Sequence, residues 1–423
     1  MSKLFIGIDL GTSGCRLCVI DKNKQRLKHY QKDIIPAQSI NGRIEQDAHL
    51  WWTTVEKLMY QLLTDIDPHR IQAICINGTS GTVLACDKNG QPLAPALMYH
   101  DSSSQQQADL IKKVAPKDSA AQGSSSGLAK ILQLHQRLPQ AAHFLHQADW
   151  IAAKFTGCFC YTDENNALKS GYDAVNRQWS DWLDDIDIPQ SKLPKVLAAG
   201  KMMTEISANT AKQFNLNKNV QVIAGTTDSL AAFIATGAHK LGDAVSSLGS
   251  TLVLKIITDT PIYNAEIGIY SHRLGAHWLA GGASNSGGAV LLKYFSLQQV
   301  QYMSEQIDEQ HLSGLHYYPL LRNGERFPQY APDKAPLLKP RPNDDVVFFQ
   351  AMLEGIAYIE KDGYKKLQQL GAGFPSNIIS CGGGSKNKKW QTIRQRIMAT
   401  DITQARISDA CYGSALLCLK GSC

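Results

Sequence analysis

Residues 4–20, LFIGIDLGTSGCRLCVI, constrain the fold more than any other stretch of this 423-residue chain. Two apolar runs flank the turn GTSG, a pattern that predicts a hairpin of two strands whose tip exposes backbone N–H groups. An aspartate, Asp9, interrupts the first apolar run. Because glycine lets a ligand approach the backbone closely, Gly7, Gly11 and Gly14 around it indicate that this carboxylate meets a ligand.

The rest of the chain alternates strand and helix patterns, which is typical of an α/β protein. A Pro-, Arg- and Asp-rich stretch at 320–345 predicts a loop, and 102–220 mixes helical segments with polar connections in no clear order. The patterns predict helices at 48–63, from Asp228, at 347–370 and from Cys411, and strands at 71–78, from 220 to a Gly-Thr-Thr turn, and up to 381.

A second glycine-turned hairpin is predicted at residues 242–257, GDAVSSLGSTLVLKII. Its similarity to the first hairpin indicates a duplicated architecture that closes on one ligand. The length of the chain also favours two domains over one.

The composition is that of an ordinary globular chain, with 43% hydrophobic and 19% charged residues and a formal net charge of +6. The basic residues are scattered, which suits anionic ligands but is too diffuse to indicate nucleic-acid binding. No apolar run approaches the roughly 20 residues that a membrane span needs, and no leader pattern precedes the first strand. We therefore expect a cytoplasmic protein that binds neither membrane nor nucleic acid.

Ten cysteines lie along the chain without a CxxC pair, and the nearest two, Cys158 and Cys160, flank a single residue. This usage favours free thiols in a reducing compartment over zinc ligands or disulfides. The histidines at 135, 143 and 146 lack a spacing that compels a metal site. The aromatic pairs at 51–52 and 348–349 are interpreted as core packing.

Three glycine-containing stretches are candidates for ligand binding. The stretch CGGGSKN at 381–387 predicts either a loop that holds a flat or phosphorylated ligand or a tight strand–helix junction. Asp228 follows Gly-Thr-Thr at a helix start, where it is either an N-cap or a ligand-facing carboxylate, and these two interpretations are compatible. The turn NGTSGT contributes the hydroxyls of Thr79 and Ser80. Neither GxxxxGK[ST] nor a GxGxxG after the first strand is present.

Taken together, these motifs resemble the FGGY family of carbohydrate kinases, in the superfamily of actin, hexokinase and Hsp70. The resemblance runs from residue 4 to 419 and rests on IGIDLGTSGCRLCVID, VIAGTTDSLAAFIATGA, SLGSTLVL, IISCGGGSKNKKWQ and DACYGSALL. Within that family, NGTSGTVL, NALKSGY and GGASNSGGA look like a short branch of D-ribulose kinases from cyanobacteria and plant plastids. MYHDSSSQ replaces the family's Trp-Asp-x-Arg type of sugar motif, and NGTSG replaces a Gln-containing segment of xylulokinases.

The resemblance implies an α/β fold of two ribonuclease-H-like (actin/hexokinase-type) domains with an interdomain cleft. It assigns 1–235 with 409–423 to a sugar- and phosphate-binding domain and 236–408 to an ATP-binding domain. The implied reaction is ATP-dependent phosphorylation of a linear ketopentose, D-ribulose to D-ribulose 5-phosphate. L-ribulose, D-xylulose or a pentitol remain alternatives, as does a non-catalytic sugar and nucleotide sensor, and the protein is expected to be a monomer or homodimer.

The resemblance also implies roles for individual residues. Asp228 is the expected general base, and Asp9 orients the sugar and holds Mg²⁺ through water. The expected sugar-binding residues are Asp9, Ser13, Gly14, Cys15, Arg16, Ser80, Asp228 and Ser229. The expected ATP-binding residues are Thr12, Gly249, Ser250, Thr251, Asn285, Gly288, Gly383, Gly384, Ser385, Lys386 and Asn387.

Overall fold

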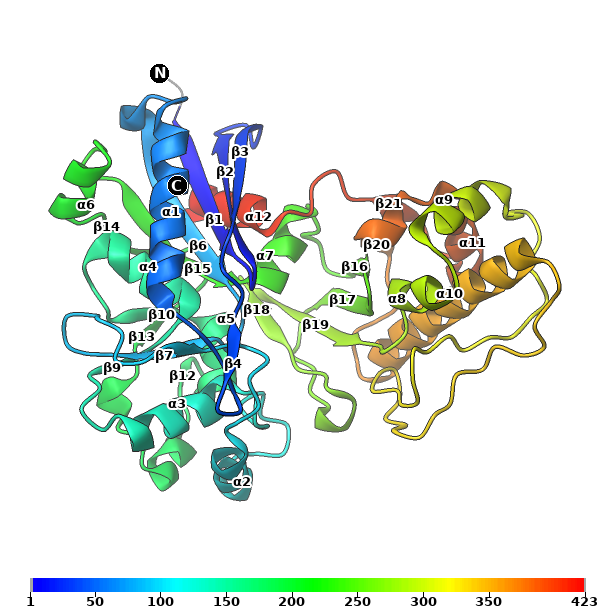
Figure 1. Ribbon diagram of the computed structural model, residues 1–423, viewed down its shortest axis with the longest axis horizontal. Helices are drawn as coiled ribbons and strands as arrows, with labels where there is room; N and C mark the ends of the chain where they lie inside the picture. The colour runs from blue at the N-terminus through cyan, green and yellow to red at the C-terminus, as the bar shows by residue number, and fades with distance from the viewer. Residues whose placement is uncertain (1–2, 422–423) are drawn as a thin grey trace. The chain divides into compact units, whose positions relative to one another are not determined.

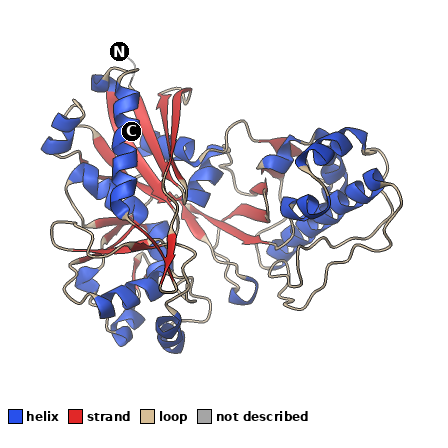
Figure 2. Ribbon diagram, in the orientation of Figure 1, coloured by secondary structure: helices blue, strands red, loops and turns tan. Residues whose placement is uncertain are grey.

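The computed structural model describes residues 3–421, and the chain divides into two compact units (Figure 1). The first unit is Met1–Ala235 with Ile407–Cys423, and the second is Thr236–Arg406. Each unit contains its own mixed sheet with flanking helices (Figure 2).

The first unit is built from fifteen strands and eight helices in its described part. Its strands are β1 (Leu4–Leu10), β2 (Gly14–Asp21), β3 (Arg26–Asp33), β4 (Gln38–Ile40), β5 (Arg43–Gln46), β6 (Ile71–Gly78), β7 (Val83–Cys86), β8 (Ala96–Leu97), β9 (His143–His146), β10 (Tyr161–Asp163), β11 (Tyr172–Asp173), β12 (Gln178–Trp179), β13 (Lys195–Leu197), β14 (Met202–Glu205) and β15 (Gln221–Thr227). Its helices are α1 (Ala48–Leu63), α2 (Gln105–Val114), α3 (Gly127–Arg137), α4 (Gln147–Thr156), α5 (Glu164–Ala167), α6 (Ala208–Gln213), α7 (Asp228–Ala235) and α12 (Ala410–Gly421).

The main sheet of this unit has the strand order β14-β15-β6-β1-β2-β3. Strands β1, β6 and β15 are parallel, so their carboxyl ends meet at one edge of the sheet. The predicted hairpin is confirmed, because β1 and β2 are antiparallel neighbours joined at residues 11–13. The structure therefore brings the end of the first strand beside the ends of β6 and β15.

Strand β1 is buried on both faces. Its residues Leu4, Ile6, Ile8 and Leu10 belong to one apolar core together with Trp51 and Val55 of α1. Since side chains alternate along a strand, Phe5, Gly7 and Asp9 lie on the opposite face, which α12 covers. Asp9 thus reaches the same side of the sheet as α12 (red in Figure 1).

A methyl group at Gly7 has no space in this packing. A Cβ built there would lie 1.9 Å from the Cys411 carbonyl oxygen and 2.4 Å from the Ala415 nitrogen, both backbone atoms of α12. We expect Gly7→Ala to lower the free energy of unfolding by about 3 kcal/mol or more, because the added methyl group would force α12 away from β1. Thermal and denaturant unfolding measure this loss. Gly11→Ala is the matched control, since its Cβ would meet nothing nearer than 3.4 Å; equal stability of the two variants would contradict the packing of α12.

The second unit contains six strands and four α-helices. They are β16 (Asp243–Leu248), β17 (Leu252–Thr258), β18 (His272–Leu274), β19 (His277–Ala283), β20 (Asn377–Cys381), β21 (Ile402–Gln404), α8 (Gly288–Tyr294), α9 (Leu297–Gln306), α10 (Asp345–Gln369) and α11 (Lys388–Met398). The sheet order is β18-β19-β17-β16-β20-β21. The predicted second hairpin, the loop at 320–345 and the long helix are all confirmed.

The two sheets share a strand pattern. In each sheet, the second strand of a hairpin (β1–β2 or β16–β17) pairs antiparallel with a further strand, β3 or β19. The first strand of the hairpin pairs in parallel with β6 or β20. A third strand, β15 or β21, then adds in parallel. This pattern supports the duplication predicted from the two hairpins.

A buried ion pair ties the helices of the second unit to its sheet. The Arg394 guanidinium donates to both carboxylate oxygens of Glu360, at 2.6 and 2.7 Å, and to the Ser380 hydroxyl at 2.7 Å. The Ser246 hydroxyl donates to Glu360. Removing one partner would leave a buried charge unpaired, so this network fixes β16 and β20 against α10 and α11.

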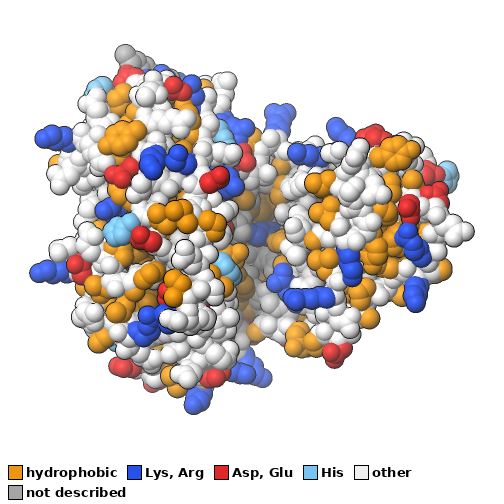
Figure 3. Space-filling model, viewed as in Figure 1, with side chains coloured by type: hydrophobic (Ala, Val, Ile, Leu, Met, Phe, Trp, Pro, Cys, Tyr) orange, Lys and Arg blue, Asp and Glu red, His pale blue; other side chains and the backbone are white. Residues whose placement is uncertain are grey.

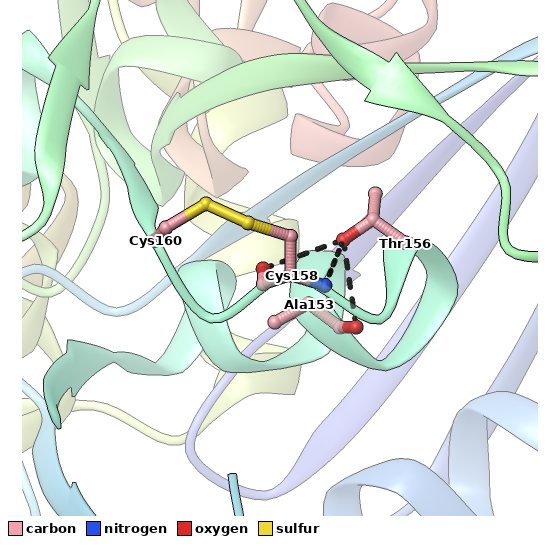
Figure 4. Close-up of a disulfide and its surroundings, with 4 residues drawn as sticks. All are labelled: Ala153, Thr156, Cys158 and Cys160. Carbon is pink, nitrogen blue, oxygen red and sulfur yellow. Dashed lines mark hydrogen bonds between the residues drawn. A yellow bond between two sulfur atoms is a disulfide. The ribbon is translucent and has the colours of Figure 1, made fainter. Parts of the chain in front are cut away.

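The prediction that all cysteines are free thiols is wrong for one pair. Cys158 and Cys160 form a disulfide in the loop after α4, with their Cα atoms 5.5 Å apart (Figure 4). Spacing alone did not indicate it, since the bond depends on how the backbone turns back between the two residues.

Two further expectations concern the distribution of basic residues on the surface and the presence of helices that could span a membrane. On the face shown in Figure 3, Lys and Arg side chains are dispersed among neutral ones. Among residues 3–421, no helix combines the length and apolar character needed to cross a membrane.

Candidate active site

The carboxyl ends of β1, β6 and β15 bring two aspartates into one unit. Asp9 pairs across the sheet with Arg16 of β2 and with Asn77 of β6. Asp228 follows β15 directly and is the first residue of α7. The structure therefore gathers Asp9, Arg16 and Asp228 at one edge of the first sheet, although Asp228 lies more than 200 residues after the other two in the sequence.

Burial and neighbouring charge both act on Asp9. Its side chain is nearly buried, and an Arg16 Nη1 atom donates to its Oδ2 at 3.1 Å. Burial, followed by the negative charge of Asp228, raises the pKa of Asp9 from 3.8 to about 6, although Arg16 opposes this shift. A buried carboxylate with a raised pKa is a candidate ligand-binding group, for a cation or for a polar ligand.

Asp228 is the first residue of α7, at the helix start that the sequence predicted. Its Oδ1 accepts a hydrogen bond from the Ser229 N–H at 2.6 Å. The side chain is half-buried. The start of α7 thus holds this carboxylate in one orientation while leaving it accessible.

Several buried polar atoms near the ends of β6 and β15 have no hydrogen-bond partner among the described residues. They are the Ser80 hydroxyl, the Gln147 side-chain nitrogen and the Thr227 hydroxyl, here called the unpartnered cluster. The other Gln147 side-chain atom accepts from the Thr79 N–H at 3.0 Å and its hydroxyl at 2.9 Å, and Thr227 pairs with Gly78 across the sheet. A buried polar atom without a partner is costly, so these atoms indicate a site for a polar ligand.

A buried lysine, Lys130 of α3, holds the loops beside this cluster. Its ammonium group donates to the carbonyl oxygens of Gly81, Tyr99 and Ser125, at 2.8, 3.1 and 2.9 Å. Burial lowers the pKa of Lys130 to about 7. Lys130 and Gln147 were missed in the sequence, since nothing in a helical pattern marks a lysine or glutamine that turns inward.

The second unit contains a pocket of about 800 Å³ at the carboxyl ends of β16 and β20. Backbone forms part of its wall at Gly249, Ser250, Gly288, Gly383 and Gly384. Its apolar side chains are Leu248, Ala289, Leu291, Leu292, Leu297, Val300, Phe349, Leu353 and Trp390, and its polar ones are Gln301, Ser304, Glu305, Lys386, Asn387, Lys388 and Lys389. Apolar walls, bare backbone and ammonium groups together suit a flat aromatic ligand that carries anionic groups.

Glycine is required at the rim of this pocket. Gly382 has φ +83°, and its Cβ would lie 2.8 Å from the Leu248 carbonyl oxygen. At Gly288 a Cβ would lie 2.9 Å from the Gly249 carbonyl oxygen, because the β16–β17 turn packs directly against the start of α8. These approaches explain why the chain has glycines in both places.

Four predicted ligand residues are not placed as expected. The Cys15 thiol lies in the apolar core, because strand alternation turns it away from the face of Arg16. The Ser385 hydroxyl donates back to the Gly382 carbonyl oxygen at 2.7 Å, and Thr251 does not line the pocket. Asn285 is engaged with the loop at 324–325 through its N–H and side chain and is also absent from the pocket wall.

The remaining predicted residues lie where they can meet ligands. Gly249, Ser250, Gly288, Gly383, Gly384, Lys386 and Asn387 line the pocket of the second unit. Thr12, Ser13 and Gly14 form or adjoin the β1–β2 turn, and Ser229 is exposed beside Asp228. The apolar wall from α8, α9 and α10 was not predicted, because Phe349 and Leu353 follow the ordinary spacing of core residues.

Comparisons with known proteins agree on one family. Models of the FGGY family of carbohydrate kinases match residues 4–235 (N-terminal domain) and 244–421 (C-terminal domain). The xylulose kinase of Staphylococcus xylosus is 23% identical over 98% of this chain and 90% of its own length, and that of Haemophilus influenzae is 26% identical over 94% and 86%. A solved xyloylose kinase structure from Brucella ovis superposes with a TM-score of 0.88 at 22% identity, over 99% of this chain and 90% of that one. The predicted mixed α/β, two-domain fold is thereby confirmed.

Proposed function

Because this chain belongs to the FGGY family of carbohydrate kinases, we propose that it transfers a phosphoryl group from ATP to a hydroxyl of a linear ketopentose. The observation that carries this proposal is the pair Asp9 and Asp228 beside the unpartnered cluster. Phosphoryl transfer to an alcohol needs a proton acceptor and groups that position the acceptor hydroxyl, and this edge of the first sheet supplies both kinds.

Asp228 is the proposed general base. The Ser229 N–H fixes its carboxylate, which then accepts the proton of the attacking sugar hydroxyl as the new O–P bond forms. A carboxylate of ordinary basicity cannot deprotonate an alcohol beforehand, so positioning provides most of its effect.

Asp9 is the proposed carboxylate for the sugar and, through water, for Mg²⁺. Magnesium is bound in proteins by one or two carboxylates together with phosphates and retained waters, and the nearly buried Asp9 carboxylate can supply one of these oxygen ligands. When bound, Mg²⁺ would neutralise charge on the phosphates. Arg16 keeps Asp9 oriented and favours its ionised form.

The pH dependence of kcat/KM should report the ionisation of Asp9. Because the pKa of Asp9 is about 6 and its ionised form is needed, we expect kcat/KM to fall about tenfold per pH unit below that value. Arg16→Gln removes the charge that lowers this pKa, so the acid limb should move to higher pH. Steady-state kinetics of both proteins between pH 5 and 8, a range set by the Asp9 pKa, measure this shift. An unmoved limb would show that another group titrates.

The unpartnered cluster is the proposed binding site for sugar hydroxyls. Ser80 and Thr227 can donate or accept, and the Gln147 nitrogen can donate, so the cluster matches the hydroxyls of a linear sugar. Lys130 acts by positioning, because its three hydrogen bonds hold the turn that contains Ser80.

The pocket of the second unit is the proposed ATP site, with its apolar wall for the base and the turn Gly249–Ser250 for the phosphates. A Cβ at Gly383 would meet no atom within 4 Å, so a larger residue fits the fold and projects into the pocket. We expect Gly383→Val to raise the KM for ATP about tenfold or more without lowering the melting temperature. Gly383→Ala is the graded control, with a small effect. An unchanged KM in the valine variant would place ATP elsewhere.

We rank the candidate sugars in three groups. The curated relatives favour D-xylulose, since those from Staphylococcus xylosus and Haemophilus influenzae are xylulose kinases, although only 23–26% identical. D-ribulose is the rival that the motifs NGTSGTVL and MYHDSSSQ predict. L-ribulose and pentitols share the same chain length and hydroxyl chemistry and rank third.

A coupled assay of ADP release tests the proposal. The purified chain with Mg²⁺-ATP is given D-xylulose, D-ribulose, L-ribulose, the pentitols, glycerol or gluconate, with a reaction lacking sugar as reference. We expect the largest kcat/KM with a ketopentose. A preference for glycerol or gluconate would overturn the ketopentose assignment while leaving the kinase intact.

A further inference from the structure

The disulfide-bonded cysteines Cys158 and Cys160 are more accessible than most of the free cysteines in residues 3–421. Both are half-buried, whereas six of the seven free cysteines are buried and Cys381 alone is half-buried. The disulfide closes a loop of only three residues, so it restrains the unfolded chain little. Its contribution is therefore expected in the local geometry rather than in global stability.

Contacts on both sides connect this disulfide to the unit. At the end of α4, the Thr156 hydroxyl accepts from the Cys158 N–H at 3.1 Å and lies 3.4 Å from the Cys158 carbonyl oxygen (Figure 4). Between the two cysteines, Phe159 stacks on His143 and fills the space over Gly90, whose Cβ would lie 2.0 Å from its ring. The Cys160 carbonyl oxygen accepts from the Lys195 N–H at 2.8 Å and so begins the pairing of β10 with β13.

Strand β10 leads from the disulfide toward the proposed base. It ends at Asp163, whose carboxylate accepts from the Asn165 and Asn166 N–H groups, at 2.9 and 3.0 Å, and thereby begins α5. The Asn165 side chain then donates to the Thr226 hydroxyl at 3.1 Å. Thr226 is followed by Thr227 of the unpartnered cluster and by Asp228, so five residues of chain and one buried hydrogen bond join Cys160 to the site.

We propose that Cys158 and Cys160 form a thiol–disulfide exchange site, which takes a dithiol reductant and controls the contact between Asn165 and Thr226. In the disulfide form the loop fixes the start of β10 and hence Asn165. In the dithiol form the chain from Gly157 to Cys160 loses this restraint, and the contact with Thr226 loosens. The kinetic effect rests on the function proposed above, whereas the exchange itself does not.

The exchange is balanced by a dithiol. One reductant thiolate attacks a sulfur of the pair, forming a mixed disulfide as the Cys158–Cys160 bond breaks, and the released thiolate takes up a proton. The second reductant thiolate then attacks the mixed disulfide and releases the other cysteine. The reductant leaves as its own disulfide, having supplied two electrons, and the reverse reaction consumes a disulfide oxidant.

The test compares oxidised and dithiothreitol-reduced protein. Alkylation and peptide mapping should show Cys158 and Cys160 protected in the first state and modified in the second. Hydrogen exchange of residues 161–166 should be faster after reduction. With a ketopentose, kcat/KM should fall about threefold or more on reduction, with the KM for ATP unchanged.

Cysteine variants supply the controls. Cys158→Ser and Cys160→Ser, either of which suffices if the other does not fold, should lose the response to dithiothreitol, and Cys381→Ser should retain it. If the thiols of Cys158 and Cys160 still react with the alkylating reagent after oxidation, the exchange site is overturned. If residues 161–166 exchange hydrogen equally fast in both states, the coupling to Asn165 is overturned. Because these two readouts need no turnover, they separate failure of this proposal from failure of the proposed kinase activity.

Discussion

Asp228→Asn is expected to lower kcat for sugar-dependent ADP release by about 10²–10⁴-fold, the range typical for loss of a general base. The amide keeps the shape of the side chain and its hydrogen bond from the Ser229 N–H, but it cannot accept the proton of the sugar hydroxyl. Nucleotide affinity should be unchanged, because the pocket of the second unit does not contain this residue. Initial-rate kinetics and titration with ADP measure the two effects.

Asp185→Asn is the matched control for this variant. Asp185 is exposed in a short helical turn of the same unit, so its loss of charge should leave kcat unchanged. A general base usually contributes more than a factor of about ten to kcat. If Asp228→Asn retained kcat within about tenfold of the wild type, Asp228 would therefore not be the proton acceptor.

Asp9→Asn should produce the second largest loss, about 10²–10³-fold in kcat, which is the usual cost of removing one electrostatic contact to the transition state. The reason is that the variant keeps the volume of the side chain but loses the charge proposed to hold Mg²⁺ through water. The acid limb near pH 6 should also vanish, because the group that titrates there is gone. Kinetics with varied Mg²⁺ and pH measure both effects.

The same substitution should increase the stability of the ligand-free protein. The fold raises the pKa of Asp9 from 3.8 to about 6, so ionised Asp9 destabilises the folded state above pH 6, and this cost disappears below pH 3.8. Asp9→Asn should therefore raise the free energy of unfolding at neutral pH by roughly 3 kcal/mol, and by little at pH 4. A variant that is inactive and less stable at neutral pH would contradict this account and indicate structural damage instead.

The sequence predicted the parts of the site that depend on backbone pattern. The two glycine-turned hairpins, the strand before Asp228 and the helix after it all occur where apolar periodicity and glycine placed them. Asp9 was recognisable because a charge in a buried strand is costly without a ligand.

Side-chain direction was harder to predict. Cys15 adjoins Arg16 in a motif, yet alternation along β2 buries one and exposes the other, and applying that rule to the motif could have excluded Cys15. Ser385 and Asn285 are engaged with the backbone of nearby loops, which depends on loop geometry. Lys130, Gln147 and the disulfide depend on contacts between segments far apart in the sequence or on the path of one turn, for which the linear pattern has no signal.

The most direct test of the central claim is to quantify both products of one reaction with wild-type protein, Mg²⁺-ATP and a ketopentose. We predict one sugar monophosphate per ADP, with little ADP formed when the sugar is omitted. ADP without sugar phosphate would indicate an ATPase, and binding of both ligands with neither product would indicate a sensor. Either result would contradict the assignment of this chain as a sugar kinase.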